Sequence, residues 1–204
     1  MRRLIAAFCL FGASAAFAGA QQYEPLSASV QAILRKAVVD HSPAPDSFRG
    51  APLERANWLS AMSPRLMKRI PNDQDRYDTL KKIHYEATRA GLDPQLVLGL
   101  IQVESGFRQY AVSSAGARGY MQVMPFWVKL IGRPDDNLFD RNTSLRYGCT
   151  ILRHYLDIEK GDLFRALGRY NGSLGKPEYP NMVRAAWQNQ WSYEKPARLT
   201  ESGR

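Results

Sequence analysis

The strongest constraint on the fold of this chain is the regular recurrence of helix start and stop signals from Asp75 onward. A first amphipathic stripe ends at Gly91, a residue that readily takes the left-handed conformation of a helix C-cap. The stripe consists of Tyr77, Leu80, His84 and Ala87. No stretch alternates apolar and polar residues in the manner of a half-buried strand. The sequence therefore predicts an all-α body.

Asp93 predicts the start of the next helix, because its carboxylate can accept hydrogen bonds from free backbone N–H groups. Pro94 loses no hydrogen bond in the first turn, and Gly106 ends the helix. An irregular, glycine-rich segment follows over residues 111–119. Three more helices are expected, and their predicted starts are Asn142, Asp162 as a cap, and about Glu178. Their predicted inward residues are Leu145, Cys149, Leu152, Tyr155 and Leu156, then Leu163, Ala166, Leu167 and Tyr170, then Tyr179, Val183, Trp187 and Trp191.

The first 20 residues have the pattern of a secretory signal peptide. Arg2 and Arg3 precede an apolar stretch, and small residues at Ala16, Ala18 and Ala20 satisfy the A-x-A rule. The mature chain is expected to begin near residue 19 or 21 and to be periplasmic. A membrane anchor is the alternative. The apolar stretch is shorter than the roughly 20 residues that span a bilayer, and no later segment is apolar enough.

Residues 21–75 form a predicted N-terminal helical extension of the main body. An amphipathic helix is expected over 26–39, with Ser27 or Ser29 as its cap, followed by a proline-rich linker over 42–52. The predicted inward stripe of this helix is Val30, Ile33, Leu34, Ala37 and Val38. Two short helices are expected over 53–62 and 64–70. The catalytic body is assigned to 76–192, and a tail to 193–204.

Charge and residue usage restrict the partners. The net charge of the 204 residues is +9, and removal of Arg2 and Arg3 with the leader leaves about +7, which favours an anionic partner. The basic residues form no block or nucleic-acid motif, so an acidic cell-wall polymer is favoured over nucleic acid. The histidines have no metal-ligand spacing, and neither a metal nor another cofactor is predicted. Cys149 is expected to be a buried, inert thiol.

Glu104 is the residue that indicates catalysis. It continues the apolar stripe of Val97, Leu100 and Ile101 at helical spacing, so its carboxyl group is predicted to lie on the buried face. Burial disfavours the charged form of a carboxyl group and raises its pKa, as a general acid near neutral pH requires. The alternative is a surface glutamate at a frayed helix end.

Several ordered motifs surround this glutamate. They are Glu104-Ser105-Gly106-Phe107, Ala111-Val112-Ser113, Gly116 to Pro125, Asn137 to Asp140, Gly148 to Leu156 and Tyr170-Asn171-Gly172. Together they resemble the soluble lytic transglycosylase family over roughly residues 77–187. The resemblance implies a compact, lysozyme-like helical domain that cleaves the bond between N-acetylmuramic acid and N-acetylglucosamine in peptidoglycan. The cleavage leaves a 1,6-anhydromuramyl end and needs no cofactor.

The resemblance also assigns roles to individual positions. It implies that Glu104 is the catalytic acid and base, and that Ser105 supports the local fold. It implies a sugar-binding groove lined by Ser113, Gln122, Met124, Tyr170 and Asn171, with Tyr155 as a weaker candidate. Hydroxyl and amide groups suit sugars, whereas core filling is the alternative role for Met124 and Tyr155. Tyr120 stands where the family usually has leucine, and Gly172-Ser173 replaces the commoner Ala-Gly, which puts substrate preference in doubt.

Two other functions remain open at this stage. A lysozyme-like hydrolase would need a second carboxylate, for which Asp135, Asp136 and Asp140 are the nearest downstream candidates, although turn-forming or capping roles suit them better. A cell-wall binding or scaffold component of an envelope-spanning machine is the other alternative. Beyond peptidoglycan strands, envelope or secretion-machine proteins are candidate partners.

Overall fold

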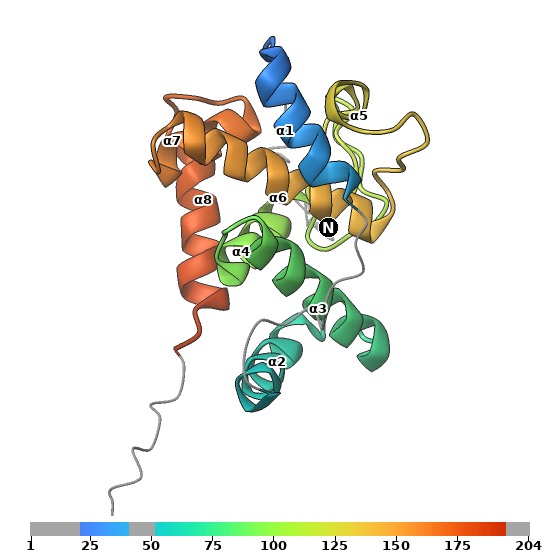
Figure 1. Ribbon diagram of the computed structural model, residues 1–204. Helices are drawn as coiled ribbons and strands as arrows, with labels where there is room; N and C mark the ends of the chain where they lie inside the picture. Colours follow the sequence, from blue (N-terminus) through green and yellow to red (C-terminus); the bar gives the residue numbers. More distant parts are fainter. Residues whose placement is uncertain (1–20, 41–51, 195–204) are drawn as a thin grey trace, which may run out of the picture.

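Helix α6 (Arg141–Ile158) is the longest of the described helices and contacts α1 (Ala28–Val39), α3 (Asp73–Arg89) and α7 (Leu163–Asn171) (Figure 1). The computed structural model describes residues 21–40 and 52–194. The helices in chain order are α1 (Ala28–Val39), α2 (Pro52–Leu66), α3 (Asp73–Arg89), α4 (Pro94–Glu104), α5 (Phe126–Ile131), α6 (Arg141–Ile158), α7 (Leu163–Asn171), α8 (Glu178–Ala186) and the π-helix η1 (Trp187–Trp191). Within these residues there is no strand, only isolated bridges of Arg118 with Val112 and Val123. The prediction of an all-α body is confirmed.

Side-chain caps begin α4 and α7 where the sequence placed them. Asp93 accepts a hydrogen bond from the backbone N–H of Gln95, and Asp162 accepts one from that of Arg165. Ser27, not Ser29, caps α1. The helix expected from Asn142 begins one residue earlier, because Asp140 is its cap.

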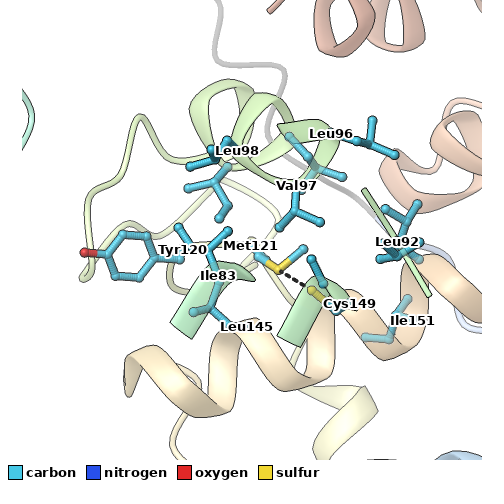
Figure 2. Close-up of a cluster of buried hydrophobic side chains, with 14 of the residues drawn as sticks. Ile83, Leu92, Leu96, Val97, Leu98, Tyr120, Met121, Leu145, Cys149 and Ile151 are labelled. Carbon is cyan, nitrogen blue, oxygen red and sulfur yellow. Dashed lines mark hydrogen bonds between the residues drawn. The ribbon is translucent and has the colours of Figure 1, made fainter. Parts of the chain in front are cut away.

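Met121 and α6 pack closely at the centre of the core (Figure 2). A Cβ atom at Gly148 of α6 would lie 2.6 Å from the Cβ atom of Met121, so only glycine allows this approach. Cys149 is fully buried, with its Sγ atom 3.9 Å from the Sδ atom of Met121. Burial raises the pKa of this thiol, and the prediction of a buried, inert cysteine is confirmed.

The buried face of α3 differs from the predicted stripe. Tyr77 is exposed, whereas Ile83 and two charged residues, Arg76 and Glu86, are buried. Burial of a charge is tolerated because hydrogen bonds replace its hydration. Arg76 donates to the Ser63 hydroxyl of α2 and to the carbonyl groups of Ile70 and Pro71 in the connection between α2 and α3. The prediction was wrong here because a hydropathy pattern treats every charged residue as an outward one.

Helix α2 continues through Pro64, so the predicted break before this residue was wrong. Pro64 lies in the last turn, where the loss of its N–H removes one hydrogen bond from a helix that ends two residues later. Trp58 and Met62 of this helix are buried in the same hydrophobic cluster as α4 and α6.

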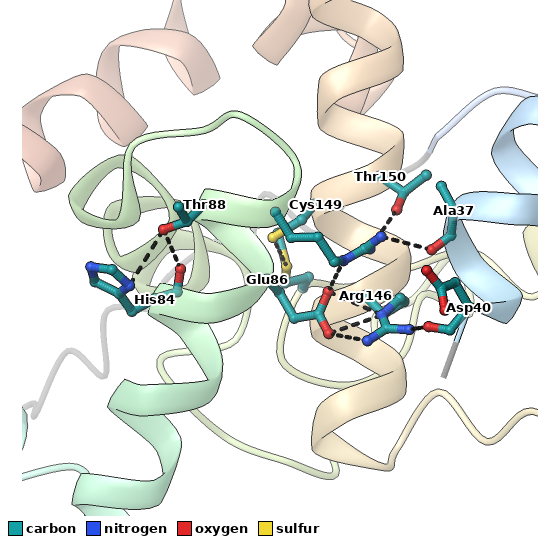
Figure 3. Close-up of polar contacts among 10 residues, drawn as sticks. Ala37, Asp40, His84, Glu86, Thr88, Arg146, Cys149 and Thr150 are labelled. Atoms are coloured by element: carbon teal, nitrogen blue, oxygen red, sulfur yellow. Dashed lines mark hydrogen bonds and ion pairs between the residues drawn. The ribbon is translucent and has the colours of Figure 1, made fainter. Parts of the chain in front are cut away.

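Helix α1 buries Leu34 and Val38, but Ile33 is exposed, contrary to the predicted stripe. A cluster of charges fastens the end of this helix to the body (Figure 3). Glu86 pairs with Arg89 at 2.9 Å and with Arg146 at 2.7 Å. The two arginines also donate to the carbonyl groups of Ala37 and Asp40, which end α1. Because Ile33 is exposed, helix α1 buries only part of its apolar surface against the body, and the charge cluster holds its end.

Helix α5, which is six residues long, was not predicted. The last helix was predicted to carry Trp187 and Trp191 inward; after Ala186 this stretch continues as the π-helix η1, in which Trp191 is buried. The π-helix docks closely, because a Cβ atom at Gly99 of α4 would lie 2.8 Å from the backbone nitrogen of Trp187. The Trp191 indole donates to the side chain of Gln102 at 2.8 Å, which fixes η1 on α4.

Three predictions lie outside the described residues: the signal peptide over 1–20, most of the linker over 42–52, and the tail beyond residue 194. Across residues 21–40 and 52–194, no helix combines the length and apolarity needed to cross a membrane.

Candidate active site

Glu104 is the last residue of α4, and its side chain faces the interior. The residue is only 7% exposed, and the preceding Leu100 and Ile101 are fully buried. This confirms the predicted position on the apolar face of the helix. A buried carboxyl group at the negative end of a helix dipole is disfavoured in its charged form. Gly106 then turns the chain away with a φ of 59°.

Tyr179 of α8 contacts this carboxyl group directly. Its hydroxyl donates a hydrogen bond to Oε1 of Glu104. Burial, followed by the charge of Glu104, raises the pKa of Tyr179 well above its usual value, so the hydroxyl remains a donor. Sequence analysis placed Tyr179 on the inner face of its helix but gave it no role at the site. The predicted inward position of Tyr179 could have indicated this role, because a buried tyrosine hydroxyl normally needs a hydrogen-bond partner.

Tyr170 and Asn171 end α7 beside the same region. The Tyr170 hydroxyl donates to the carbonyl group of Met121 at 2.7 Å. Burial and then the charge of Glu104 raise the pKa of Tyr170 well above its usual value, so its hydroxyl remains a donor. The amide of Asn171 donates to the Ser173 hydroxyl, while its Oδ1 atom is buried without a hydrogen-bond partner among the described residues. A buried acceptor of this kind can receive a hydrogen bond from a ligand.

The loop after Glu104 is held by its own polar side chains. Ser105 donates to the carbonyl groups of Ile101 and Tyr120, which confirms its predicted part in the local fold. Gln122 is buried with a φ of 48°, and its amide donates to the carbonyl groups of two loop residues, Ala111 and Gly119. The Gln122 side chain therefore braces the loop from within.

The remaining groove candidates lie in different surroundings. Ser113 is half-buried and accepts a hydrogen bond from the backbone N–H of Ala117 within its own turn. Met124 is half-buried against the core. Tyr155 is buried beside Trp127 and lines a hollow of about 170 Å³ together with Arg169 and Gly172. Among these tyrosines, Tyr179 contacts Glu104 directly, whereas Tyr170 bonds to Met121 and Tyr155 packs beside Trp127.

Two of the three downstream carboxylates, those of Asp136 and Asp140, make structural contacts. Asp136 accepts hydrogen bonds from the Tyr147 hydroxyl at 2.5 Å and from the backbone N–H of Arg133. Asp140 caps α6, and Asp135 is exposed. The turn-forming and capping interpretations are confirmed for Asp136 and Asp140. In the described part of the chain, no three His, Cys, Asp or Glu side chains gather as metal ligands would.

The sequence model of the transglycosylase SLT domain matches residues 81–185, a range that contains Glu104, Tyr170 and Tyr179. The chain belongs to this family. The predicted resemblance is thereby confirmed, and every contact of Glu104 described above lies within the SLT domain.

Two curated relatives are similar in sequence to parts of this SLT domain protein. The protein named "Transglycosylase" of Enterobacteria phage PRD1 is 36% identical over 88 residues, which are 43% of this chain and 32% of the phage protein. The "Membrane-bound lytic murein transglycosylase C" of Yersinia pestis (strain Pestoides F) is 30% identical over 139 residues, 59% of this chain and 39% of the relative. The chain thus spans well under half the length of these relatives.

Among solved structures, an inactive mutant of the lytic transglycosylase Slt from Pseudomonas aeruginosa is similar at a TM-score of 0.42 and 17% identity. The similarity covers 68% of this SLT domain protein and 31% of the Pseudomonas chain.

Proposed function

We propose that this protein is a peptidoglycan lytic transglycosylase that cleaves the β-1,4 bond between N-acetylmuramic acid and N-acetylglucosamine. The observation that carries the proposal is the buried carboxyl group of Glu104, which accepts a hydrogen bond from Tyr179 inside an SLT transglycosylase domain. A carboxyl group in such surroundings is suited to give up a proton and to take it back.

One carboxyl group can serve both steps of the proposed reaction. Protonated Glu104 gives its proton to the glycosidic oxygen, the bond from that oxygen to C1 of the muramic sugar breaks, and the leaving sugar departs with a hydroxyl group. The Glu104 carboxylate then accepts the proton of the C6 hydroxyl while O6 bonds to C1. The 1,6-anhydro ring closes without water, and intramolecular attack has a large entropic advantage. Tyr179 stabilises the carboxylate between the two steps through its hydrogen bond.

Polar groups near Glu104 support a sugar-binding role. The Oδ1 atom of Asn171 offers a buried acceptor for a sugar hydroxyl or acetamido N–H group. We infer that Tyr170, Gln122 and Met124 shape the groove beside it, and that Ser113 and Tyr155 contact the glycan farther from the reacting bond. Gln122 would act through its backbone, since its side-chain amide already bonds the loop.

We also infer that the chain is exported and acts in the periplasm on peptidoglycan strands. Residues 21–75 would brace the body. This inference is supported by the burial of Leu34, Trp58 and Met62 in the shared hydrophobic cluster and by the ion pairs of Glu86 beneath α1.

The experiment is digestion of purified sacculi in ¹⁸O-labelled water, followed by mass analysis of the products. The native chain should release unlabelled 1,6-anhydromuramyl products. Glu104→Gln should keep its fold and lose about 100-fold to 10,000-fold in rate, because it has no transferable proton. Labelled, reducible muramic ends as the main product would favour the hydrolase instead. Binding to sacculi without cleavage would favour the scaffold role.

A further inference from the structure

Gln21, at the start of the described chain, inserts its side chain into the region assigned to the glycan. The residue is only 3% exposed, although its neighbours 22–25 are exposed. Its Oε1 atom accepts a hydrogen bond from the backbone N–H of Met124 at 3.3 Å, and its Nε2 atom donates one to the carbonyl group of Gln122 at 3.4 Å. The Gln21 amide thus both donates a hydrogen bond to and accepts one from the backbone of the loop that follows Glu104.

The two backbone groups form a site for an amide in general. An N–H group and a carbonyl group that point at the same amide complement one C=O acceptor and one N–H donor. The acetamido group of an N-acetylated sugar carries the same two groups. Both hydrogen bonds of Gln21 are at the long end of the usual range, so the contact is weak enough to be exchanged for another amide.

Other contacts keep the segment 21–24 over the site. Glu24 pairs with Arg169 of α7 at 2.9 Å, and the Tyr23 ring packs edge-on against Phe126 of α5 with centroids 5.7 Å apart. Gln22 and Glu24 also line the hollow that contains Tyr155. The segment therefore extends across residues to which the proposed function assigns the glycan.

The far end of the segment approaches Tyr170. The Tyr170 hydroxyl donates to the carbonyl group of Met121, and the carbonyl group of the next residue, Gln122, accepts a hydrogen bond from Gln21. Burial and then the charge of Glu104 raise the pKa of Tyr170, whereas the Gln21 amide lowers it. A ligand in the position of Gln21 would therefore lie near Tyr170, one of the residues to which the proposed function assigns the groove.

We propose that the segment 21–24 is an internal occupant of the glycan groove, with the Gln21 amide in the place of a sugar acetamido group, so that substrate must displace it. The inference rests on the proposed function, because it takes the groove to bind N-acetylated glycans. Since α1 keeps the segment near the groove, its effective concentration is high and independent of protein concentration. The segment acts as a tethered competitor that favours long glycan strands able to displace it through many contacts.

The test measures binding without turnover. The full chain, purified after export and carrying Glu104→Gln, is titrated calorimetrically with chitohexaose, whose sugars all carry acetamido groups, and with cellohexaose, whose sugars carry none. Gln21→Ala removes both hydrogen bonds, and Gln21→Glu keeps the shape but loses the donor to Gln122. Gln21→Ala should bind chitohexaose roughly fivefold more tightly, because two long, weak competing hydrogen bonds are lost. Gln21→Glu keeps the acceptor for the Met124 N–H group and loses only the donor, so its gain should be smaller, about twofold. Cellohexaose should show no such gain.

Gln31→Ala is the matched control. Its amide also donates to a backbone carbonyl of the body, that of Leu130 at 2.5 Å, but on α1 and not at Gln122 or Met124. It should leave the affinity unchanged. Unchanged or weaker chitohexaose binding by both Gln21 variants would overturn the proposal. An equal gain in affinity for cellohexaose, or an equal gain in chitohexaose affinity in Gln31→Ala, would also overturn it, as would the absence of binding by any chain. Failure of the proposed function would be seen separately, as cleavage of sacculi by Glu104→Gln.

Discussion

The Tyr179 hydroxyl donates a hydrogen bond to Oε1 of Glu104, which joins α8 to the end of α4 across 75 positions of sequence. Both residues are buried, and the pKa of Tyr179 is raised well above its usual value. The tyrosine thus keeps its proton over the working range and supports a carboxylate at Glu104. This contact connects the docking of the last helices with the proposed chemistry.

Tyr179→Phe removes the hydroxyl and keeps the ring. We expect a folded protein with activity on sacculi reduced by about 10-fold to 100-fold, because a hydrogen bond to a charged group contributes about 1.5–3 kcal/mol. Loss of a donor to the carboxylate also favours its protonated form. The general acid would then remain protonated to higher pH, so the decline of activity on the basic side should move upward. A pH–rate profile with the same basic limb as the native chain would contradict this role.

Asp136→Asn distinguishes the transglycosylase from the hydrolase. The new amide oxygen can still accept hydrogen bonds from Tyr147 and from the backbone N–H of Arg133, but the side chain can no longer act as a second carboxylate. We expect activity within about threefold of the native value and a stability change of about 1 kcal/mol or less. Loss of turnover by a folded Asp136→Asn chain would support a two-carboxylate mechanism.

Glu86→Ala should be strongly destabilising. The Glu86 side chain is only 5% exposed and pairs with Arg89 and Arg146, so its removal leaves two nearly buried guanidinium groups without their carboxylate. We expect a loss of about 3–5 kcal/mol in the free energy of unfolding, measured in urea. Asp78→Ala is the control, because its pair with Lys81 is exposed and should contribute less than about 1 kcal/mol. Equal losses of unfolding free energy in Glu86→Ala and Asp78→Ala would refute a special contribution from the ion pairs of Glu86 with Arg89 and Arg146.

Stability should decrease at mildly acidic pH because of His154. Burial lowers the pKa of His154 and outweighs the opposite effects of Asp157 and Glu24. The unfolded chain therefore binds a proton near pH 6.5 that the folded chain binds only at lower pH, so the free energy of unfolding falls as the pH drops below about 6.5. The loss is complete below the folded pKa. His154→Gln should show a smaller difference in unfolding free energy between pH 7.5 and pH 5.5, and an unchanged difference would rule out His154 as a source.

The sequence by itself determined the starts of α4 and α7 and the orientation of Glu104. Caps such as Asp93 and Asp162 act within one turn, and helical spacing places Glu104 on the same face as Ile101, so both features depend on local geometry that the order of residues fixes. The ordered motifs from Glu104 to Gly172 indicated the family. Hydropathy periodicity was less complete, because in α3 it found the buried Leu80 and Ala87 but also predicted that the exposed Tyr77 is buried and missed Arg76 and Glu86.

Only the tertiary structure decided which distant groups meet. Arg76 and Glu86 are buried because partners from other segments replace their hydration, and no local pattern reports such partners. The contact of Tyr179 with Glu104 requires α8 to dock on α4, and the insertion of Gln21 requires the first described residues to reach a loop 101 positions away. Hydropathy periodicity indicates which face of a helix turns inward. The packing of separate helices determines which side chains that face contacts, and the proposed active site is formed by this packing.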